Sequence, residues 1–333
     1  MKDLWVVITT INEPTEAIYE YIKQSKISGF KVLIVGDTKT PDTYKKLECE
    51  FLSYEDQLLM EKKTGLSFPV RHYARKNFGY IYAINSGAEY IFDTDDDNIP
   101  YSDFMNYISR DFDIYEYPNN GFINVYKFFV DNDIWPRGYP LNKIRESYKL
   151  DKSLLKDFEV PGDKVIQFMA DGEPDVDAIY RLVDNRKVFF PRDNNAYVVN
   201  KNQMCPFNSQ ATLYPKSAFI LLYLPFTAPF RMTDIWRSFI FQIMRDDFNV
   251  DLVFAGSVVR QIRNEHDFLE DFSDEVLGYL NNEKVFSKSF LGLSSDIDRY
   301  EKVIEVYKAF VRNELVNPSE IDFYRKWLEL IKI

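Results

Sequence analysis

The segment Y-I-F-D-T-D-D-D-N-I-P at residues 90–100 decides the expected fold, because a short apolar run passes directly into a cluster of acids. Residues 90–92 are apolar or aromatic, as in a buried strand. Four carboxylates follow within five residues, at Asp93, Asp95, Asp96 and Asp97. Their mutual repulsion is relieved when a cation binds them, so the segment predicts a divalent-metal site.

Acidic clusters are often no more than solvated turns, so the alternatives matter. An EF-hand loop counted from Asp93 would need Gly at its sixth position and Glu at its twelfth, where this chain has Asn98 and Phe104. What remains is a strand followed by D-x-D-D-D. Oxygen ligands on such a turn suit Mg²⁺ or Mn²⁺ shared with substrate phosphates, so we expect one of these ions, completed by a diphosphate.

Composition indicates a folded enzyme. The chain has 333 residues, of which 46% are hydrophobic and 17% aromatic, and this argues against disorder. The net charge of −11 argues against nucleic-acid and anionic-membrane partners. Cys49 and Cys205 are isolated, which favours reduced thiols over a zinc site or a disulfide. The apolar run 4–11 lacks signal-peptide features and no stretch is long enough to span a bilayer, so we expect a cytoplasmic protein without a transmembrane segment.

The first hundred residues alternate between strand and helix patterns. Residues 4–10 and 31–35 are β-branched strands that flank a helix at 14–25, and a later helix covers 75–86. The carboxyl ends of the predicted parallel strands carry Thr10 to Glu13, Gly36 to Thr38 and Asp93 to Asp97, and such ends meet at one edge of a sheet. We therefore expect these three groups to surround one nucleotide.

The usual phosphate-binding motifs are absent. Neither G-x-G-x-x-G after the first strand nor G-x-x-x-x-G-K-[ST] occurs, so dinucleotide redox chemistry and P-loop phosphoryl transfer have no support. A metal on the acidic turn, helped by Arg71, Arg75 and Lys76, could hold a diphosphate instead. An ordinary solvated helix face explains these three cations equally well.

Several motifs in one order resemble the STELLO-type glycosyltransferases over about residues 1–275. They are I-T-T-I-N-E-P, V-G-D-T-K-T-P, H-Y-A-R-K-N-F-G-Y, the acidic segment above, I-W-P-R-G-Y-P-L, T-D-I-W-R-S-F and Q-I-R-N-E-H-D, at residues 8–14, 35–41, 72–80, 90–100, 134–141, 233–239 and 261–267. The chain is more distantly similar to the reversibly glycosylated polypeptides, which include nucleotide-sugar mutases.

The resemblance implies an α/β GT-A fold, a Rossmann-like sheet that binds a nucleotide sugar through a D-x-D motif and a divalent cation. Asp95 and Asp97 match the D-x-D pair, with Asp97 the direct metal ligand and Asp95 a contact to metal or ribose. The remaining donor positions implied by the match lie in the first-strand loop, after the second strand and on the following helix, at Thr9, Asn12, Glu13, Asp37 and Arg75.

The resemblance also implies residues for the transfer step. Asp234 stands where related enzymes place a carboxylate near the acceptor hydroxyl, so we expect it to act as general base, although it could equally cap the helix that follows. His266 is the expected third metal ligand. Arg263, with Arg260, is expected to hold the diphosphate leaving group, unless these cations form only a solvated helix face.

The middle and the end of the chain are harder to interpret. The rigid aromatic segment 135–140 suits an acceptor-facing loop or, more simply, a packed turn. The acids at 171–177 favour helix capping over a second metal site. We expect a catalytic domain at 1–272, with a nucleotide-binding half at 1–100 and an acceptor half at 101–272, and a helical extension at 273–333 that packs on it or mediates homo-oligomer formation.

Two classes of function follow. The first is a metal-dependent transferase that moves a sugar from a nucleoside diphosphate donor, expected to be UDP-linked, to a glycan or another hydroxyl acceptor, with inversion if Asp234 is the base. The second is a nucleotide-sugar mutase or a noncatalytic scaffold that binds the donor. Product formation with an acceptor would separate transfer from mutase activity.

Overall fold

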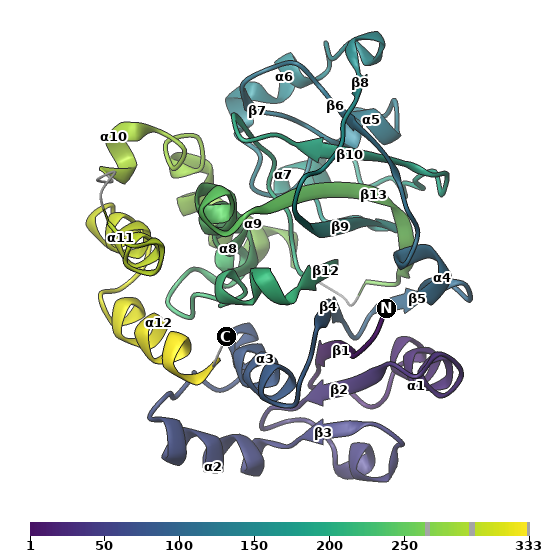
Figure 1. Ribbon diagram of the computed structural model, residues 1–333, viewed down its shortest axis with the longest axis vertical. Helices are drawn as coiled ribbons and strands as arrows, with labels where there is room; N and C mark the ends of the chain where they lie inside the picture. Colours follow the sequence, from purple (N-terminus) through teal and green to yellow (C-terminus); the bar gives the residue numbers. More distant parts are fainter. Residues whose placement is uncertain (264–266, 293–296, 332–333) are drawn as a thin grey trace.

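A single large mixed sheet runs through the molecule in the computed structural model, which describes residues 1–263, 267–292 and 297–331 (Figure 1). Within these residues the sheet has eleven strands, in the order β3-β2-β1-β4-β12-β9-β13-β10-β6-β8, with β5 paired to β13. A second sheet contains only β7 and β11. The acidic turn lies between β4 and β5, near the middle of the large sheet.

The first four strands of the chain are parallel neighbours. They are β1 (Leu4–Thr9), β2 (Lys31–Val35), β3 (Glu50–Leu52) and β4 (Tyr90–Asp95). Thr9 pairs with both Val35 and Asp95, so the three expected strand ends do meet at one edge. The helices between these strands are α1 (Glu16–Ser28), α2 (Tyr54–Thr64) and α3 (Lys76–Asn85). The predicted βαβ beginning is confirmed, whereas β3 and α2 had no counterpart in the sequence prediction.

The rest of the sheet mixes both strand directions. Its members are β12 (Ala211–Pro215), β9 (Asp163–Asp171), β13 (Val250–Gln261), β10 (Asn195–Val199), β6 (Asp113–Glu116), β8 (Lys156–Asp157) and β5 (Asn98–Pro100), with β7 (Gly121–Phe122) and β11 (Gln203–Met204) in the small sheet. Strand β12 runs antiparallel to β4, while β9 and β13 are parallel. Because β5 pairs with the end of β13, Gln261 lies opposite Asn98 and directly beside the acidic turn.

Alternation along the strands builds a core on each face of the sheet. Leu4, Val6 and Ile8 pack with α1 and with α4 (Phe104–Ile108), whereas Trp5 and Val7 share a core with α3 and with α8 (Thr233–Met244). Period-two burial of this kind is what the apolar strand sequence requires once both faces are covered. The other short helices are α5 (Tyr126–Phe129), α6 (Ile144–Ser147), α7 (Ala178–Val183) and α10 (Lys288–Leu291).

The last part of the chain is helical, as expected. The long helices here are α9 (Phe268–Asn281), α11 (Arg299–Arg312) and α12 (Ser319–Leu330), and in Figure 1 the yellow α11 and α12 lie along one side of the molecule. Their apolar side chains join the same core as α3 and α8, so they pack against the body of the protein. None of the helices in the described residues is long and apolar enough to cross a membrane.

Glycine at position 79 allows α3 to lie directly on the sheet. A Cβ atom there would collide with Val35 and stand 3.0 Å from Val7 Cγ1. Only a residue without a side chain lets the helix axis come this close to β1 and β2. The close packing fixes the N-terminal end of α3, with Arg75 and Lys76, beside the strand ends.

A buried carboxyl group fastens α12 to the loop that precedes α8. Glu320 accepts hydrogen bonds from Tyr223 Oη (2.8 Å), and from the backbone N–H (2.5 Å) and Oγ1 (2.8 Å) of Thr227. Burial raises the pKa of Glu320 from 4.5 to about 7, although these hydrogen bonds work to lower it. Between pH 4.5 and about 7, Glu320 is therefore protonated in the folded protein and ionised in the unfolded chain.

Stability should consequently fall with rising pH through this window. Between pH 4.5 and 7, we expect the unfolding free energy of wild type to fall by up to about 1.4 kcal/mol per pH unit relative to that of Glu320→Gln. Above pH 7 the difference between the two proteins should stay constant. Urea unfolding of both proteins from pH 4.5 to 8 measures this, with Glu301→Gln on the exposed side of α11 as control. Parallel profiles for wild type and Glu320→Gln would contradict it.

Candidate active site

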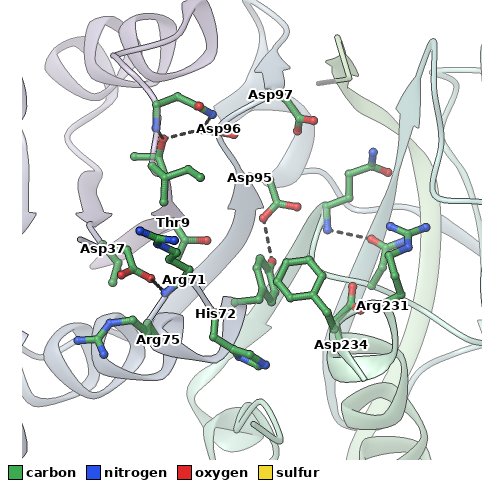
Figure 2. Close-up of a pocket in the computed structure, with 18 of the residues that line it drawn as sticks. Thr9, Asp37, Arg71, His72, Arg75, Asp95, Asp96, Asp97, Arg231 and Asp234 are labelled. Carbon is green, nitrogen blue, oxygen red and sulfur yellow. Dashed lines mark hydrogen bonds between the residues drawn. The ribbon is translucent and has the colours of Figure 1, made fainter. Parts of the chain in front are cut away.

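The four acids of the turn differ in how the protein engages them. Asp93 points into the core, where Lys76 Nζ lies 2.6 Å from its Oδ1 and Arg237 Nη1 lies 2.9 Å from its Oδ2. Asp96 accepts hydrogen bonds from Thr10 Oγ1 (2.5 Å) and Asn12 Nδ2 (2.9 Å), which ties the first-strand loop to the turn. Asp95 and Asp97 remain directed toward a shared space (Figure 2).

Asp95 and Asp97 carry charge that the protein neutralises only in part. Asp95 Oδ1 accepts hydrogen bonds from Tyr73 Oη at 2.8 Å and Lys76 Nζ at 3.2 Å, yet burial raises its pKa to about 6. Asp97 Oδ2 accepts one from Gln261 Nε2 at 3.0 Å, and burial followed by repulsion from Asp95 raises its pKa to about 7. A cation between them would favour both charged forms.

The donor set fits a cation that shares its ligands with a substrate. Among residues 1–263, 267–292 and 297–331, no three His, Cys, Asp or Glu side chains are grouped to hold a metal on their own. Two carboxylates plus the phosphates of a ligand is the arrangement typical of Mg²⁺ and Mn²⁺. The predicted third ligand, His266, lies outside the described residues.

A cavity of about 490 Å³ opens beside these two carboxylates. This is the size of pockets that bind small molecules. Figure 2 shows Asp95 between Thr9, Asp37 and Arg71 on one side and Arg231 and Asp234 on the other. The wall is made by the ends of β1, β2, β4 and β13 and by the segment that begins α8. The lining residues are Thr9, Thr10, Ile11, Asn12, Val35, Gly36, Asp37, Arg71, His72, Tyr73, Arg75, Asp95, Asp96, Asp97, Arg137, Asp175, Asn208, Gln210, Phe230, Arg231, Asp234, Gln261 and Arg263.

On the N-terminal wall, the structure brings together Thr9, Asn12, Asp37 and Arg75, as the sequence predicted for a donor site. Asp37 receives the backbone N–H groups of Thr38 and Arg71, each at 2.6 Å, and so fixes the loop that leads to α3. Glu13 is exposed, accepts a hydrogen bond from Thr43 and does not line the cavity.

The predicted phosphate-binding cations are mostly engaged within the protein. Arg75 reaches Gln57 Oε1 (2.8 Å), Glu61 Oε1 (3.2 Å) and the carbonyl of Phe68 (2.7 Å). Lys76 is fully buried beneath Asp95 and also donates to the carbonyl of Thr94. The sequence offered two explanations for Lys76, phosphate binding or a solvated helix face, and neither holds. Lys76 instead forms buried ion pairs with Asp93 and Asp95 of the acidic segment.

On the opposite wall, one arginine joins two carboxylates. Arg137 contacts Asp175 through Nε and Nη2 (both 2.8 Å), and Asp234 through Nη1 (3.0 Å) and Nη2 (2.9 Å). Burial works to raise the pKa of Asp175, but Arg137 outweighs it and holds that pKa below its ordinary value. Sequence reasoning missed Arg137 and Asp175, although both lie in segments that it singled out.

The structure resolves the alternatives for residues 135–140 and 171–177. Trp135 and Tyr139 are buried, so residues 135–140 form a packed turn that presents Arg137 to the cavity, and the aromatic acceptor-loop interpretation is wrong. Helix capping in the later segment is confirmed for Asp177, whose Oδ1 accepts the N–H of Tyr180 at 2.8 Å. Asp175 lies before that cap and faces Arg137 instead.

Asp234 lines the cavity, but its carboxylate is fully hydrogen-bonded. Besides Arg137, it accepts the backbone N–H groups of Ser209 (3.2 Å) and Ile235 (3.0 Å). These four donors use the acceptor positions of both oxygens. The capping alternative is wrong, because α8 begins at Thr233 and Met232 is its N-cap residue. The role of Asp234 as general base stays a prediction that requires Arg137 to release one oxygen.

Arg263 connects the two walls. Its Nη2 lies 3.4 Å from Asp271, and its positive charge works against the raised pKa of Asp97. Burial, together with Arg181 and Arg231, lowers the pKa of Arg263 itself to about 10. A weakly paired guanidinium near Asp97 is suited to bind an anionic ligand. Arg260, by contrast, is exposed on β13 and does not line the cavity.

Comparison with known proteins gives the chain its relatives. No protein-family model matches it. It is 27% identical to STELLO2 of Arabidopsis thaliana, described as a probable glycosyltransferase, over 351 aligned residues. This alignment covers 98% of the chain and 44% of STELLO2. It is 28% identical over 258 residues to STELLO1 of the same plant, described likewise, with 71% of this chain and 32% of STELLO1 covered. The chain thus spans less than half the length of these relatives.

The similarity to STELLO2 extends over nearly the whole chain. The fold agrees with the expected GT-A-like fold. It is an α/β fold with a mixed sheet whose first strands are parallel, and a ligand-sized cavity lies at their carboxyl ends. The resemblance drawn from the motifs is confirmed: this chain is a homologue of the STELLO proteins.

Proposed function

We propose that this protein is a metal-dependent glycosyltransferase that moves a sugar from a nucleoside diphosphate donor, a UDP-sugar, to a hydroxyl acceptor. The observation that carries the proposal is the pair Asp95 and Asp97, two incompletely neutralised carboxylates at a strand end, beside a cavity of about 490 Å³. The description of its relatives as probable glycosyltransferases supports the same reaction class.

The donor would lie along the N-terminal wall. Thr9, Asn12 and Asp37 offer hydrogen-bonding groups for the nucleoside, and each Asp37 oxygen that receives a backbone N–H keeps a second lone pair for a base N–H. Asp95 and Asp97 would hold Mg²⁺ or Mn²⁺ against the diphosphate, and Arg263 would contact the same phosphates. A bound divalent ion would stabilise the negative charge of the departing nucleoside diphosphate.

The acceptor would approach from the Arg137 side. Asp234 would remove the proton of the attacking hydroxyl, which would give inversion at the anomeric carbon in a single displacement. Because Asp175 also binds Arg137, that guanidinium could shift fully onto Asp175 and free one oxygen of Asp234. The proposed base is therefore coupled to a second carboxylate.

Donor binding provides the first test. With UDP at about 100 times its dissociation constant and Mn²⁺ present, wild type should gain roughly 2.7 kcal/mol of stability, visible as a rise in melting temperature. Asp97→Asn should lose the metal-dependent part of this gain, because a neutral amide is a poor ligand for a divalent ion. Asp157→Asn, an exposed acid outside the cavity, is the matched control and should behave like wild type.

The same experiment can refute the proposal. A UDP shift that is identical in Mn²⁺ and in EDTA would contradict metal-assisted binding. No shift with UDP, other nucleoside diphosphates or their sugar conjugates would contradict donor binding, and with it the transferase, the mutase and the donor-binding scaffold.

A second test addresses the proposed base. Asp234→Asn should keep the UDP and Mn²⁺ shift but lower sugar transfer by about 10²–10⁴-fold, the usual loss when a general base is removed. Asp175→Asn keeps the proposed base but weakens the carboxylate that would take Arg137 from it, so it should also lower turnover, although less than Asp234→Asn. Equal losses in the two variants would show that both carboxylates only position Arg137. Full activity in Asp234→Asn would remove it as the base.

A further inference from the structure

A single aromatic ring interrupts the polar C-terminal wall of the cavity. Phe230 is 49% exposed, an unusual state for a large apolar side chain in the interior of a site. Every other lining residue from position 137 onward is charged or carries an amide, namely Arg137, Asp175, Asn208, Gln210, Arg231, Asp234, Gln261 and Arg263. Among the lining residues that the structure describes, Phe230 is thus the one apolar side chain that this wall offers to a ligand.

The backbone around Phe230 is held on both sides. Before it, Thr227 is fixed by Glu320, and its Oγ1 accepts the N–H of Asn317 at 2.9 Å. After it, the carbonyl of Arg231 accepts a hydrogen bond from Arg137 Nη1, and Met232 N–H donates to the carbonyl of Pro229 at 2.8 Å. A ring exposed on so constrained a turn is pre-organised for contact, because little entropy remains to be lost on binding.

Neighbouring rings place Phe230 close to the proposed reaction centre. Its centroid lies 6.4 Å from that of Tyr73, whose hydroxyl donates to Asp95, and 5.9 Å from that of His72. Both contacts are edge-to-face. Asp234 follows four residues later, on the first turn of α8. The ring therefore lies beside Tyr73, the partner of Asp95, in the cavity that Asp95 and Asp234 also line.

Hydrogen-bonding groups line the same cavity as the ring. Burial lowers the pKa of His72, so its imidazole is neutral at pH 7. Since its Nδ1 accepts the N–H of Ala74 at 3.1 Å, the ring proton is on Nε2, which is left as a donor. Asn208, Gln210 and Arg231 supply further polar groups on the same cavity wall. An exposed apolar face in a cavity lined mostly by polar groups matches a sugar, whose C–H face is apolar and whose hydroxyls project outward.

We propose that Phe230 is the platform on which the acceptor's sugar ring stacks, so that the acceptor is a saccharide. This inference rests on the proposed function and specifies its acceptor class. A lipid alcohol would need a continuous apolar surface, and a serine or threonine acceptor would leave the exposed ring without a partner. A pyranose or furanose ring covers it and directs one hydroxyl toward Asp234.

Saturation-transfer NMR tests the platform directly. The probes are methyl β-glycosides of glucose, galactose, xylose and arabinose, each with UDP and Mg²⁺ and also without UDP, on the full chain. We expect transfer to the ring C–H protons of at least one glycoside in wild type and in Phe230→Tyr. Phe230→Ala should bind that glycoside about tenfold more weakly, because the aromatic face is lost. Phe189→Ala, another exposed phenylalanine but outside the cavity, should match wild type.

The UDP-induced melting shift is recorded in parallel, so the two proposals can fail separately. It should be equal in wild type and Phe230→Ala, which also shows that the variant is folded. A shift missing from wild type would contradict the donor function. Glycoside binding that is unchanged in Phe230→Ala, or the absence of binding by all four glycosides, would overturn the platform. Loss of the UDP shift in Phe230→Ala alone would also overturn it, because the ring would then serve the donor.

Discussion

The ammonium group of Lys76 is completely buried, and the carboxylates that it contacts belong to the strand that carries the acidic turn of the site. It lies 2.6 Å from Asp93 and 3.2 Å from Asp95, and Arg237 completes the pairing of Asp93 from the other side. Removing one member of a buried ionic group commonly costs about 3–5 kcal/mol, because a charge is left unpaired. This network therefore fixes the acidic turn at the end of β4, whereas no ion pair joins Asp97 to another of the described residues.

The same network joins the two walls of the cavity. Lys76 is the first residue of α3, and Gly79 allows this helix to lie directly on β1 and β2. Arg237 belongs to a different helix, α8. Both helices share one apolar core with α11 and α12. The two walls are thus held together before any ligand binds, which is what the proposed donor and acceptor sites would require of a site that positions two substrates.

Part of this arrangement could be predicted from local sequence. The β-branched strands and the acids at their ends place Thr9, Asp37, Asp95 and Asp97 at one sheet edge, since parallel strands leave little choice. Arg137, Asp175 and Asp234 could not be grouped in the same way, because they are brought together by pairings across 38 and 97 residues. Phe230 gave no periodic signal, and only its exposure inside a polar wall distinguishes it from core phenylalanines.

The central claim is that Asp95 and Asp97 bind a divalent cation together with a nucleoside diphosphate, and electron paramagnetic resonance of Mn²⁺ tests it most directly. Because the described protein offers two carboxylates rather than a closed metal cage, Mn²⁺ should bind weakly alone and much more tightly with UDP, with hyperfine coupling to the UDP phosphorus nuclei. Both the tight binding and the coupling should be lost in Asp97→Asn. Mn²⁺ binding that is unaffected by UDP, or that shows no phosphorus coupling, would contradict the account.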